Sequence, residues 1–167
     1  MSLELREAQL GDAEAIAAIH DEWVLAGNAT LRTEPRPLEE VREILGDGQM
    51  FLVALDGGEV VGWASAGPYE ESNPYYSNVR EAAVYVASSA RGRGAGRALL
   101  DGLAERALAA GVFKLVAKVF TTNEASLRLF ERAGYAPVGT HIRHGRLRGE
   151  WKDVVVLEKL LGDAVNG

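Results

Sequence analysis

The 167-residue sequence contains no cysteine. Disulfide bonds, thiolate nucleophiles and zinc sites built on cysteine are therefore excluded. Histidine is scarce too: His20, His141 and His144 form no H-E-x-x-H or similar cluster, so we expect no metal site. No apolar run is long enough to cross a bilayer. The opening "MSLELREAQLGD" lacks the basic-then-apolar layout of a signal peptide, and we expect a cytoplasmic protein.

Basic residues are fewer than acidic residues. The 18 lysines and arginines against 24 aspartates and glutamates give a net charge of −6. This balance argues against non-specific binding to nucleic acid or to an anionic membrane, although a local basic patch remains compatible with it. Hydrophobic residues make up 47% of the chain, enough for a core. The length predicts a single domain over residues 1–167.

Hydrophobic periodicity predicts strands and helices that alternate along the chain. The turn at residues 56–58, "DGG", predicts a hairpin in the first half of the chain. We therefore expect an α/β fold with a mixed rather than all-parallel sheet. The expected strands are residues 3–8, 50–55, 59–67, 80–88, 113–120, 135–143 and 151–161, and the expected helices are residues 13–27, 38–45, 94–110 and 123–134.

The segment Arg91–Arg97, "RGRGAGR", lies between a predicted strand and an amphipathic helix. The first turn of a helix leaves N–H groups without intrahelical partners, and together with the helix dipole they form an anion site. Glycines let a phosphate approach the backbone, and arginines add charge and planar donors. We interpret the segment as a diphosphate cradle; a flexible loop with solvated arginines is the alternative.

Two common phosphate-binding motifs do not fit this segment. A Walker loop needs G-x-x-x-x-G-K-[ST], and the chain has no such run. A Rossmann fingerprint counted from Gly92 needs a third glycine where Arg97 stands. That fingerprint also belongs after a first strand, whereas this segment lies in mid-chain.

Arg91-x-x-Gly94-x-Gly96 resembles the acetyl-CoA motif [QR]-x-x-G-x-[GA] of the GNAT superfamily of N-acetyltransferases. The predicted order of elements also resembles that of the superfamily. Within it, the chain resembles the phosphinothricin acetyltransferase group, which includes acetyltransferases of methionine sulfone and sulfoximine. The segments that carry this resemblance are "LRTEP" (31–35), "GPYEESNPYY" (67–76), "EAAVYV" (81–86) and "RGEWKDVVVLEKLL" (148–161).

The resemblance implies a central, largely antiparallel sheet in which the fourth strand splays from the next one. The pantetheine arm of CoA would pair with the backbone of the fourth strand, and the diphosphate would lie on the N–H groups of the glycine–arginine segment. Asn123 would contact the CoA arm; a plain helix N-cap is an equal alternative. The residues so implied are Val84, Tyr85, Val86, Arg91, Gly92, Arg93, Gly94, Ala95, Gly96, Arg97 and Asn123.

Acetyl transfer to an amine needs a base, because amines are largely protonated at neutral pH, and a donor for the thioester oxygen. The resemblance implies Glu81 as the base and the backbone N–H of Val84 as the donor. Strand alternation places Glu81, Ala83 and Tyr85 on one face. The alternative for Glu81 is a surface carboxylate paired with Arg80.

No residue is clearly the acid. In the superfamily that the chain resembles, the residue seven positions after the asparagine is often a tyrosine, and in the narrower group often a histidine. Here that position holds Phe130, which cannot donate a proton, so the thiolate would leave unprotonated or take a proton from water. Tyr135 is a second candidate, with packing as the favoured role. Arg80 and the pair Ala82–Ala83 depart from the residues usual in the group, and they leave the exact substrate open.

Among the aromatic residues, Trp23 and Trp63 are expected in the core. For Trp151 the resemblance implies a place near the acceptor region and the dimer contact, and core packing is an equal alternative.

We expect an acetyl-CoA-dependent N-acetyltransferase that acts directly on the α-amino group of a small amino acid or analogue. The acceptor's carboxylate would be met by a cation. Alternatives are a polyamine, aminoglycoside or protein N-terminus as acceptor, or a non-catalytic acyl-CoA-binding module. The resemblance also implies a homodimer. The candidate acceptor-binding residues are Arg32, Tyr75, Tyr76 and Arg80.

Overall fold

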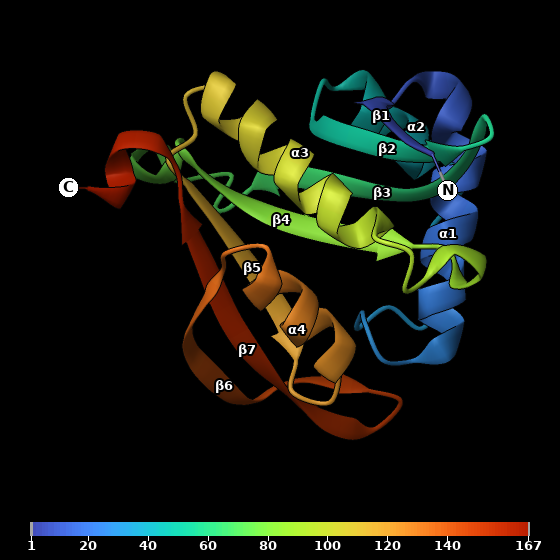
Figure 1. Cartoon of the computed structure of the whole chain (residues 1–167). Coiled ribbons are helices and arrows are strands. Elements are labelled where there is room, and N and C mark those ends of the chain that lie inside the picture. The colour runs from blue at the N-terminus through green and yellow to red at the C-terminus, as the bar shows by residue number, and fades with distance from the viewer. Residues whose placement is uncertain (1, 167) are drawn as a thin grey trace.

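The computed structural model describes residues 2–166, and its strands all join one sheet in the order β1-β2-β3-β4-β5-β7-β6 (Figure 1). The strands are β1 (Leu3–Glu7), β2 (Met50–Asp56), β3 (Glu59–Pro68), β4 (Val79–Val86), β5 (Lys114–Phe120), β6 (Ala136–Leu147) and β7 (Glu150–Leu160). The α-helices are α1 (Ala13–Ala26), α2 (Leu38–Gly46), α3 (Ala95–Ala109) and α4 (Glu124–Arg132). The predicted order of these elements is confirmed.

The sheet is mixed, as predicted, and largely antiparallel. Only β4 and β5 are parallel neighbours among the described strands. Their register runs from Val79 opposite Lys114 to Glu81 opposite Val116, and it goes no further within residues 2–166. The C-terminal half of β4 therefore separates from β5, and the sheet is open at its centre.

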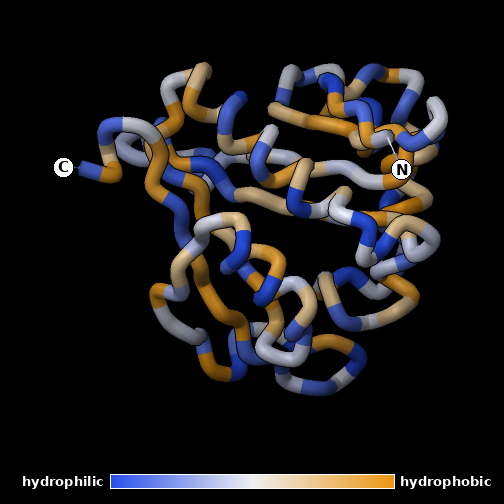
Figure 2. The backbone as a smooth tube through the Cα atoms, in the orientation of Figure 1, coloured by the Kyte–Doolittle hydropathy of each residue, from blue (hydrophilic) through white to orange (hydrophobic). Residues whose placement is uncertain are grey.

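Helices α3 and α4 cover one face of the sheet (Figure 1). Leu99 and Leu103 are four residues apart on α3, so both point to the same side, and both are fully buried. Burying a leucine side chain stabilises the fold by about 1.5–3 kcal/mol. They pack with Phe130 of α4 against apolar residues of β2 and β3. Figure 2 shows hydrophobic residues along β2.

Helices α1 and α2 cover the opposite face. Ile16 and Ile19 of α1 pack with Val41 of α2 against Phe51 and Trp63. This confirms the predicted core position of Trp63. Its indole N–H donates to the backbone carbonyl of Ile16 at 3.1 Å, which fixes α1 on the sheet.

Residues of β4 alternate between the two faces, as predicted. Ala82, Val84 and Val86 pack on the side of α3, whereas Ala83 and Tyr85 pack on the side of α1. Because side chains alternate along a strand, Glu81 belongs to the α1 side.

Strand β6 is longer than the predicted 135–143. It continues to Leu147 past an irregular stretch between His141 and Gly145, where Arg143 has a φ of 51°. The backbone N–H of Arg143 donates to the carboxylate of Asp153 at 2.7 Å, and this contact stabilises the irregular stretch. Arginines and a glycine interrupt the apolar alternation here, which is why the sequence pattern ended too early.

Trp151 lies on β7, beside β6, and is half exposed. The guanidinium of Arg146 stacks over its ring at 4.3 Å. Core packing, one of the two expectations for Trp151, is therefore wrong. Along the stretch of chain from residue 2 to residue 166, no helix has the length and apolar character needed to span a membrane.

Candidate active site

A cleft of about 740 Å³ lies where β4 and β5 separate. Its walls are the open half of β4, the loop and first turn of α3, the end of β5, and α4. Because it contains residues of both faces of β4, it passes through the plane of the sheet. The predicted residues that line it are Glu81, Val84, Tyr85, Val86, Arg91, Gly92, Gly94, Ala95, Gly96, Arg97 and Asn123.

The glycines at the start of α3 have two different structural roles. Gly94 is the N-cap and has a φ of 90°, a conformation that side chains with a β-carbon rarely adopt. A β-carbon there would meet no atom of residues 2–166 within 4 Å, so backbone conformation, not space, requires the glycine. A β-carbon on Gly96 would come within 2.8 Å of Leu129, so Gly96 lets α3 and α4 pack closely.

Two arginines of this segment line the cleft and also lie near a carboxylate. Arg91 is 4.0 Å from Glu22, and Arg97 is 2.7 Å from Asp101. All four side chains are about half exposed, and exposed ion pairs are weak. These guanidinium groups can therefore exchange their partners for a phosphate.

Arg93 departs from the predicted set. Its guanidinium lies 3.9 Å from the carboxylate of Asp56, the last residue of β2, and Arg93 is not among the described residues that line the cleft.

Asn123 is buried, and its side-chain oxygen accepts a hydrogen bond from the N–H of Ser126 at 3.2 Å. The predicted N-cap role is confirmed. Asn123 also lines the cleft, so the two roles foreseen for it are compatible. A contact between Asn123 and CoA stays a prediction.

Glu81 pairs with a residue that the sequence interpretation missed. Its Oε2 atom lies 3.1 Å from Nζ of Lys118 on β5. Arg80, the partner considered from sequence, forms no ion pair within residues 2–166. Strand alternation places its side chain on the other face of β4 from that of Glu81. The available signal was a lysine between the buried residues Ala117 and Val119.

Aromatic rings form the α1 side of the cleft. Trp23 lines it and is partly exposed, so the expectation that Trp23 belongs to the core is wrong. The ring of Tyr85 lies next to Trp23 at 6.4 Å and edge-on to His20 at 5.0 Å. Burial raises the pKa of the Tyr85 hydroxyl, so this group is protonated at neutral pH and can donate.

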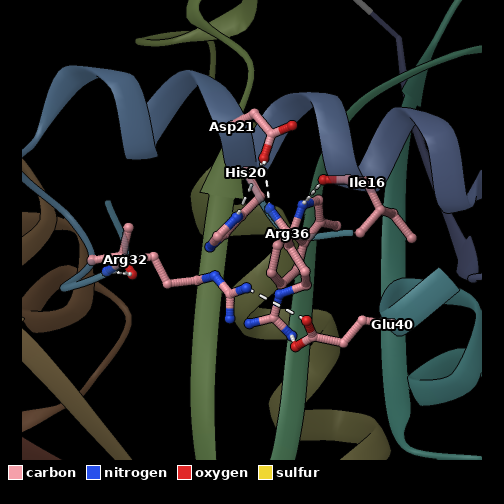
Figure 3. A network of polar contacts seen from close by, with 8 residues as sticks. Ile16, His20, Asp21, Arg32, Arg36 and Glu40 are labelled. Carbon is pink, nitrogen blue, oxygen red and sulfur yellow. Dashed lines mark hydrogen bonds and ion pairs between the residues drawn. The ribbon is translucent and has the colours of Figure 1, made fainter. Parts of the chain in front are cut away.

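A charged cluster lies beside this wall, between α1 and β4 (Figure 3). Arg32 and Arg36 each lie 3.4 Å from an oxygen of Glu40, and Figure 3 shows their two guanidinium groups meeting at this carboxylate. Asp21 adds a second carboxylate to the cluster, because its side chain accepts a hydrogen bond from the backbone N–H of Arg36 at 3.3 Å. Arg32 itself is not among the described residues that line the cleft.

His20 is buried next to this cluster (Figure 3), and its Nδ1 atom has no hydrogen-bond partner among residues 2–166. Burial lowers the pKa of His20, and the positive charge of Arg36 acts in the same direction. The imidazole is therefore neutral at neutral pH.

The remaining candidate acceptor-binding residues, Tyr75 and Tyr76, lie in the loop between β3 and β4. Tyr75 is 89% exposed and Tyr76 is 44% exposed, with the Tyr76 ring edge-on to Tyr69 at 5.8 Å. Among the described residues neither lines the cleft. Their contact with an acceptor stays a prediction.

Phe130 lines the cleft, whereas Tyr135 is not among the described lining residues. Tyr135 is buried with its ring edge-on to Phe130 at 5.0 Å, and within residues 2–166 its hydroxyl has no hydrogen-bond partner. This geometry agrees with the favoured packing role. In the described part of the chain, no group of histidine, aspartate and glutamate residues could hold a metal ion.

Three comparisons place these observations among known proteins. A family model described as "Acetyltransferase (GNAT) family" matches residues 16–135. The L-methionine sulfoximine/L-methionine sulfone acetyltransferase of Pseudomonas aeruginosa is 34% identical, over 95% of this chain and 94% of that protein. The phosphinothricin N-acetyltransferase of Streptomyces coelicolor is also 34% identical, over 95% of this chain and 96% of the relative.

A solved structure extends the similarity to three dimensions. The phosphinothricin acetyltransferase from Sinorhizobium meliloti, in complex with acetyl-CoA, matches with a TM-score of 0.91 and 31% identity. The match covers 100% of this chain and 92% of that one.

Proposed function

The chain belongs to the GNAT family of acetyltransferases, in the group of phosphinothricin and methionine sulfoximine acetyltransferases, and we propose that it acetylates the α-amino group of a small amino acid or amino-acid analogue. The observation that carries this proposal is a carboxylate, Glu81, in a cleft that passes through the sheet. One domain over residues 1–167 would supply the whole machinery, and the expected cytoplasmic location stays a prediction.

The residues of the cleft fit acetyl-CoA. The open edge of β4 can accept an extended pantetheine arm along Val84–Val86, since β5 leaves this half of the strand unpaired within residues 2–166. The N–H groups of the first turn of α3 and the exchangeable guanidinium groups of Arg91 and Arg97 would hold the diphosphate. Bound acetyl-CoA supplies an activated thioester, and the chain's own residues must orient the amine and move its proton.

Glu81 is our proposed general base. It lies at the end of the paired part of β4, on the α1 side, and its carboxylate is 36% exposed in the cleft. A carboxylate there can take a proton from an amine that enters on this side, directly or through water. The backbone N–H of Val84, three residues beyond the paired region, would donate to the developing oxyanion.

Transfer would be direct. The sequence has no cysteine to carry an acetyl group between two half-reactions. Phe130, at the usual acid position, is buried and apolar and cannot protonate the leaving thiolate. The thiolate would leave unprotonated or take a proton from water.

An amine panel tests the proposal. CoA release would be measured with α-amino acids such as methionine sulfone and phosphinothricin, with polyamines, with aminoglycosides and with peptide N-termini. We expect turnover to be fastest with an α-amino acid. Fastest turnover with another amine would reject this acceptor class but keep the acetyltransferase. Acetyl-CoA binding without turnover of any amine would instead support a non-catalytic module.

We also propose a homodimer that uses the outer edge of the sheet. Strand β6 is an edge strand, and most of its residues are exposed. The large apolar side chains there are exposed as well, with 60% for Val138, 68% for Ile142 and 50% for Trp151 on the adjacent strand. Exposed apolar patches of this kind mark protein interfaces, and a second copy would cover them.

A further inference from the structure

Lys118 and Glu81 face each other where the sheet opens. Their charged atoms are 3.1 Å apart, and both residues line the cleft. They come from the two strands that separate: Glu81 ends the paired part of β4, and Lys118 lies two residues beyond its partner Val116 on β5. Alternation therefore places both side chains on the α1 side of the sheet.

Lys118 interrupts a strand whose neighbouring residues are buried. Leu115, Val116, Ala117 and Val119 are all less than a tenth exposed, whereas the lysine side chain is 41% exposed in the cleft. The charged side chain of Lys118 therefore makes no contribution to the packing of the hydrophobic core. Ion pairs as exposed as this one contribute little to folding, so the fold does not depend on it either.

From this juxtaposition we propose that Lys118 is a specificity-determining residue that binds the carboxylate of the acceptor. The proposal rests on the proposed function. In the free protein Lys118 and Glu81 pair with each other. When an α-amino acid enters, its ammonium takes the place of Lys118 at Glu81, and its carboxylate takes the place of Glu81 at Lys118. A weak, half-exposed ion pair can exchange in this way at small cost.

The spacing of the two charges suits this class of acceptor. The ammonium and carboxylate of an α-amino acid are attached to one carbon, so they complement a cation and an anion that lie side by side. A polyamine or aminoglycoside presents only positive charge, and Lys118 would repel it. Arg32 and Arg36, the cations near α1, share Glu40, and neither is among the described residues that line the cleft. The arginines that do line it belong to the segment before α3, to α3 and to α4: Arg91, Arg97, Arg128 and Arg132.

The test compares an α-amino acid with its carboxamide, for example methionine sulfone and methionine sulfone carboxamide. For wild type we expect a lower KM with the free carboxylate. Lys118→Met should raise that KM by about 10- to 100-fold, the loss expected for one charge-assisted hydrogen bond, and leave the KM of the carboxamide nearly unchanged. The KM for acetyl-CoA should stay at its wild-type value, and it also reports that the variant is folded. Lys118→Arg should keep the preference for the carboxylate.

Lys114→Met is the matched control. Lys114 is on the same strand and face and pairs with Glu158 at 2.7 Å, but it is not among the described residues that line the cleft. Both KM values should stay at wild-type level in this variant. If Lys118→Met keeps the preference for the carboxylate, or slows both amines equally through kcat, the assignment is wrong. If wild type acetylates amines but does not prefer the carboxylate, the assignment also fails, while acetyl transfer stands. A wild-type protein that acetylates no amine would reject both.

Discussion

The indole N–H of Trp23 donates a hydrogen bond to the backbone carbonyl of Val86, 3.1 Å away. This bond joins α1 to the last residue of β4, at the point where the strand is most open. The guanidinium of Arg91 stacks on the same indole ring at 4.0 Å. One side chain thus connects the first helix, the proposed pantetheine strand and the proposed diphosphate cradle.

The cradle predicts a cofactor defect for Gly94→Val. Valine is disfavoured at a φ of 90°, so the first turn of α3 must rearrange and its N–H groups move. We expect the KM for acetyl-CoA to rise at least about tenfold, the loss of a single charge-assisted contact. Steady-state kinetics would measure it.

Gly111→Val is its control, because Gly111 has a φ of 80° at the other end of α3 and is outside the described lining of the cleft. It should lose stability but keep its cofactor KM. An unchanged KM in folded Gly94→Val would reject the cradle.

Glu81→Gln tests the base. The amide keeps the shape of the side chain but accepts no proton, so kcat should fall about 10²- to 10⁴-fold. The KM for acetyl-CoA should stay near wild type. Raising the pH should restore part of the rate, because more acceptor amine is then neutral.

Glu158→Gln is the control. Glu158 lies on the same face of the sheet, opposite Val116, but it pairs with Lys114 rather than with Lys118. Its kcat should be unaffected. A Glu81→Gln protein within about threefold of the wild-type kcat at neutral pH would show that the carboxylate is not the base.

His20 predicts a loss of stability in mild acid. Burial lowers its pKa in the folded protein, while the unfolded chain titrates near about 6.5. Below that pH the unfolded state binds a proton that the folded state excludes, so the free energy of unfolding decreases as the pH falls toward the folded pKa. Urea denaturation at several pH values between neutral and mildly acidic would record the slope.

In His20→Gln the slope over this range should be smaller, whatever the absolute stability of the variant. A slope equal to that of wild type would mean that another group is responsible. The charged residues that act on the pKa of His20, which are Arg36, Asp21, Arg32 and Glu40, are the same in both proteins of this comparison.

The exposed apolar side chains of β6 predict a dimer. Sedimentation equilibrium at micromolar concentration should give twice the mass of the chain. Ile142→Glu should produce monomers, because it would bury an unpaired charge in the interface. Leu25→Glu changes another exposed apolar residue, on α1, and should leave the dimer intact. A monomeric wild type would reject the interface.

Periodicity was sufficient to predict the helices and strands of this chain in the right order. Local signals were strong: glycine turns separate the hairpins, and leucines at helical spacing mark α3. The sequence pattern was wrong where a contact between residues on different strands determines how far a strand extends. The extension of β6 to Leu147 depends on Asp153, ten residues from the Arg143 amide that it binds, and no local period encodes that contact.

In the site, too, short motifs indicate some residues, whereas contacts between residues far apart in the sequence are not predicted. The glycine–arginine segment is predicted as an anion site from its own short motif, whereas Glu81 is singled out through the resemblance of its strand to the acetyltransferase group; both line the cleft. The Glu81–Lys118 pair joins residues 37 positions apart on strands that meet only in the folded sheet. An apolar helix face predicts a core position for Trp23, and the sequence does not reveal that this face borders a cleft.

The break at the centre of the sheet also has a consequence for local unfolding. Within residues 2–166, the backbone ladder between strands β1–β4 and strands β5–β7 consists only of the short parallel register near the start of β4. The amides of Val84 and Val86, which face the opening because the amides of Tyr85 and Ala87 face β3, should therefore exchange their hydrogens faster than those of β2 or β3 in the free protein. A ligand bound along that edge would act as the missing strand between the two halves, so acetyl-CoA should slow this exchange and raise the melting temperature of both halves together.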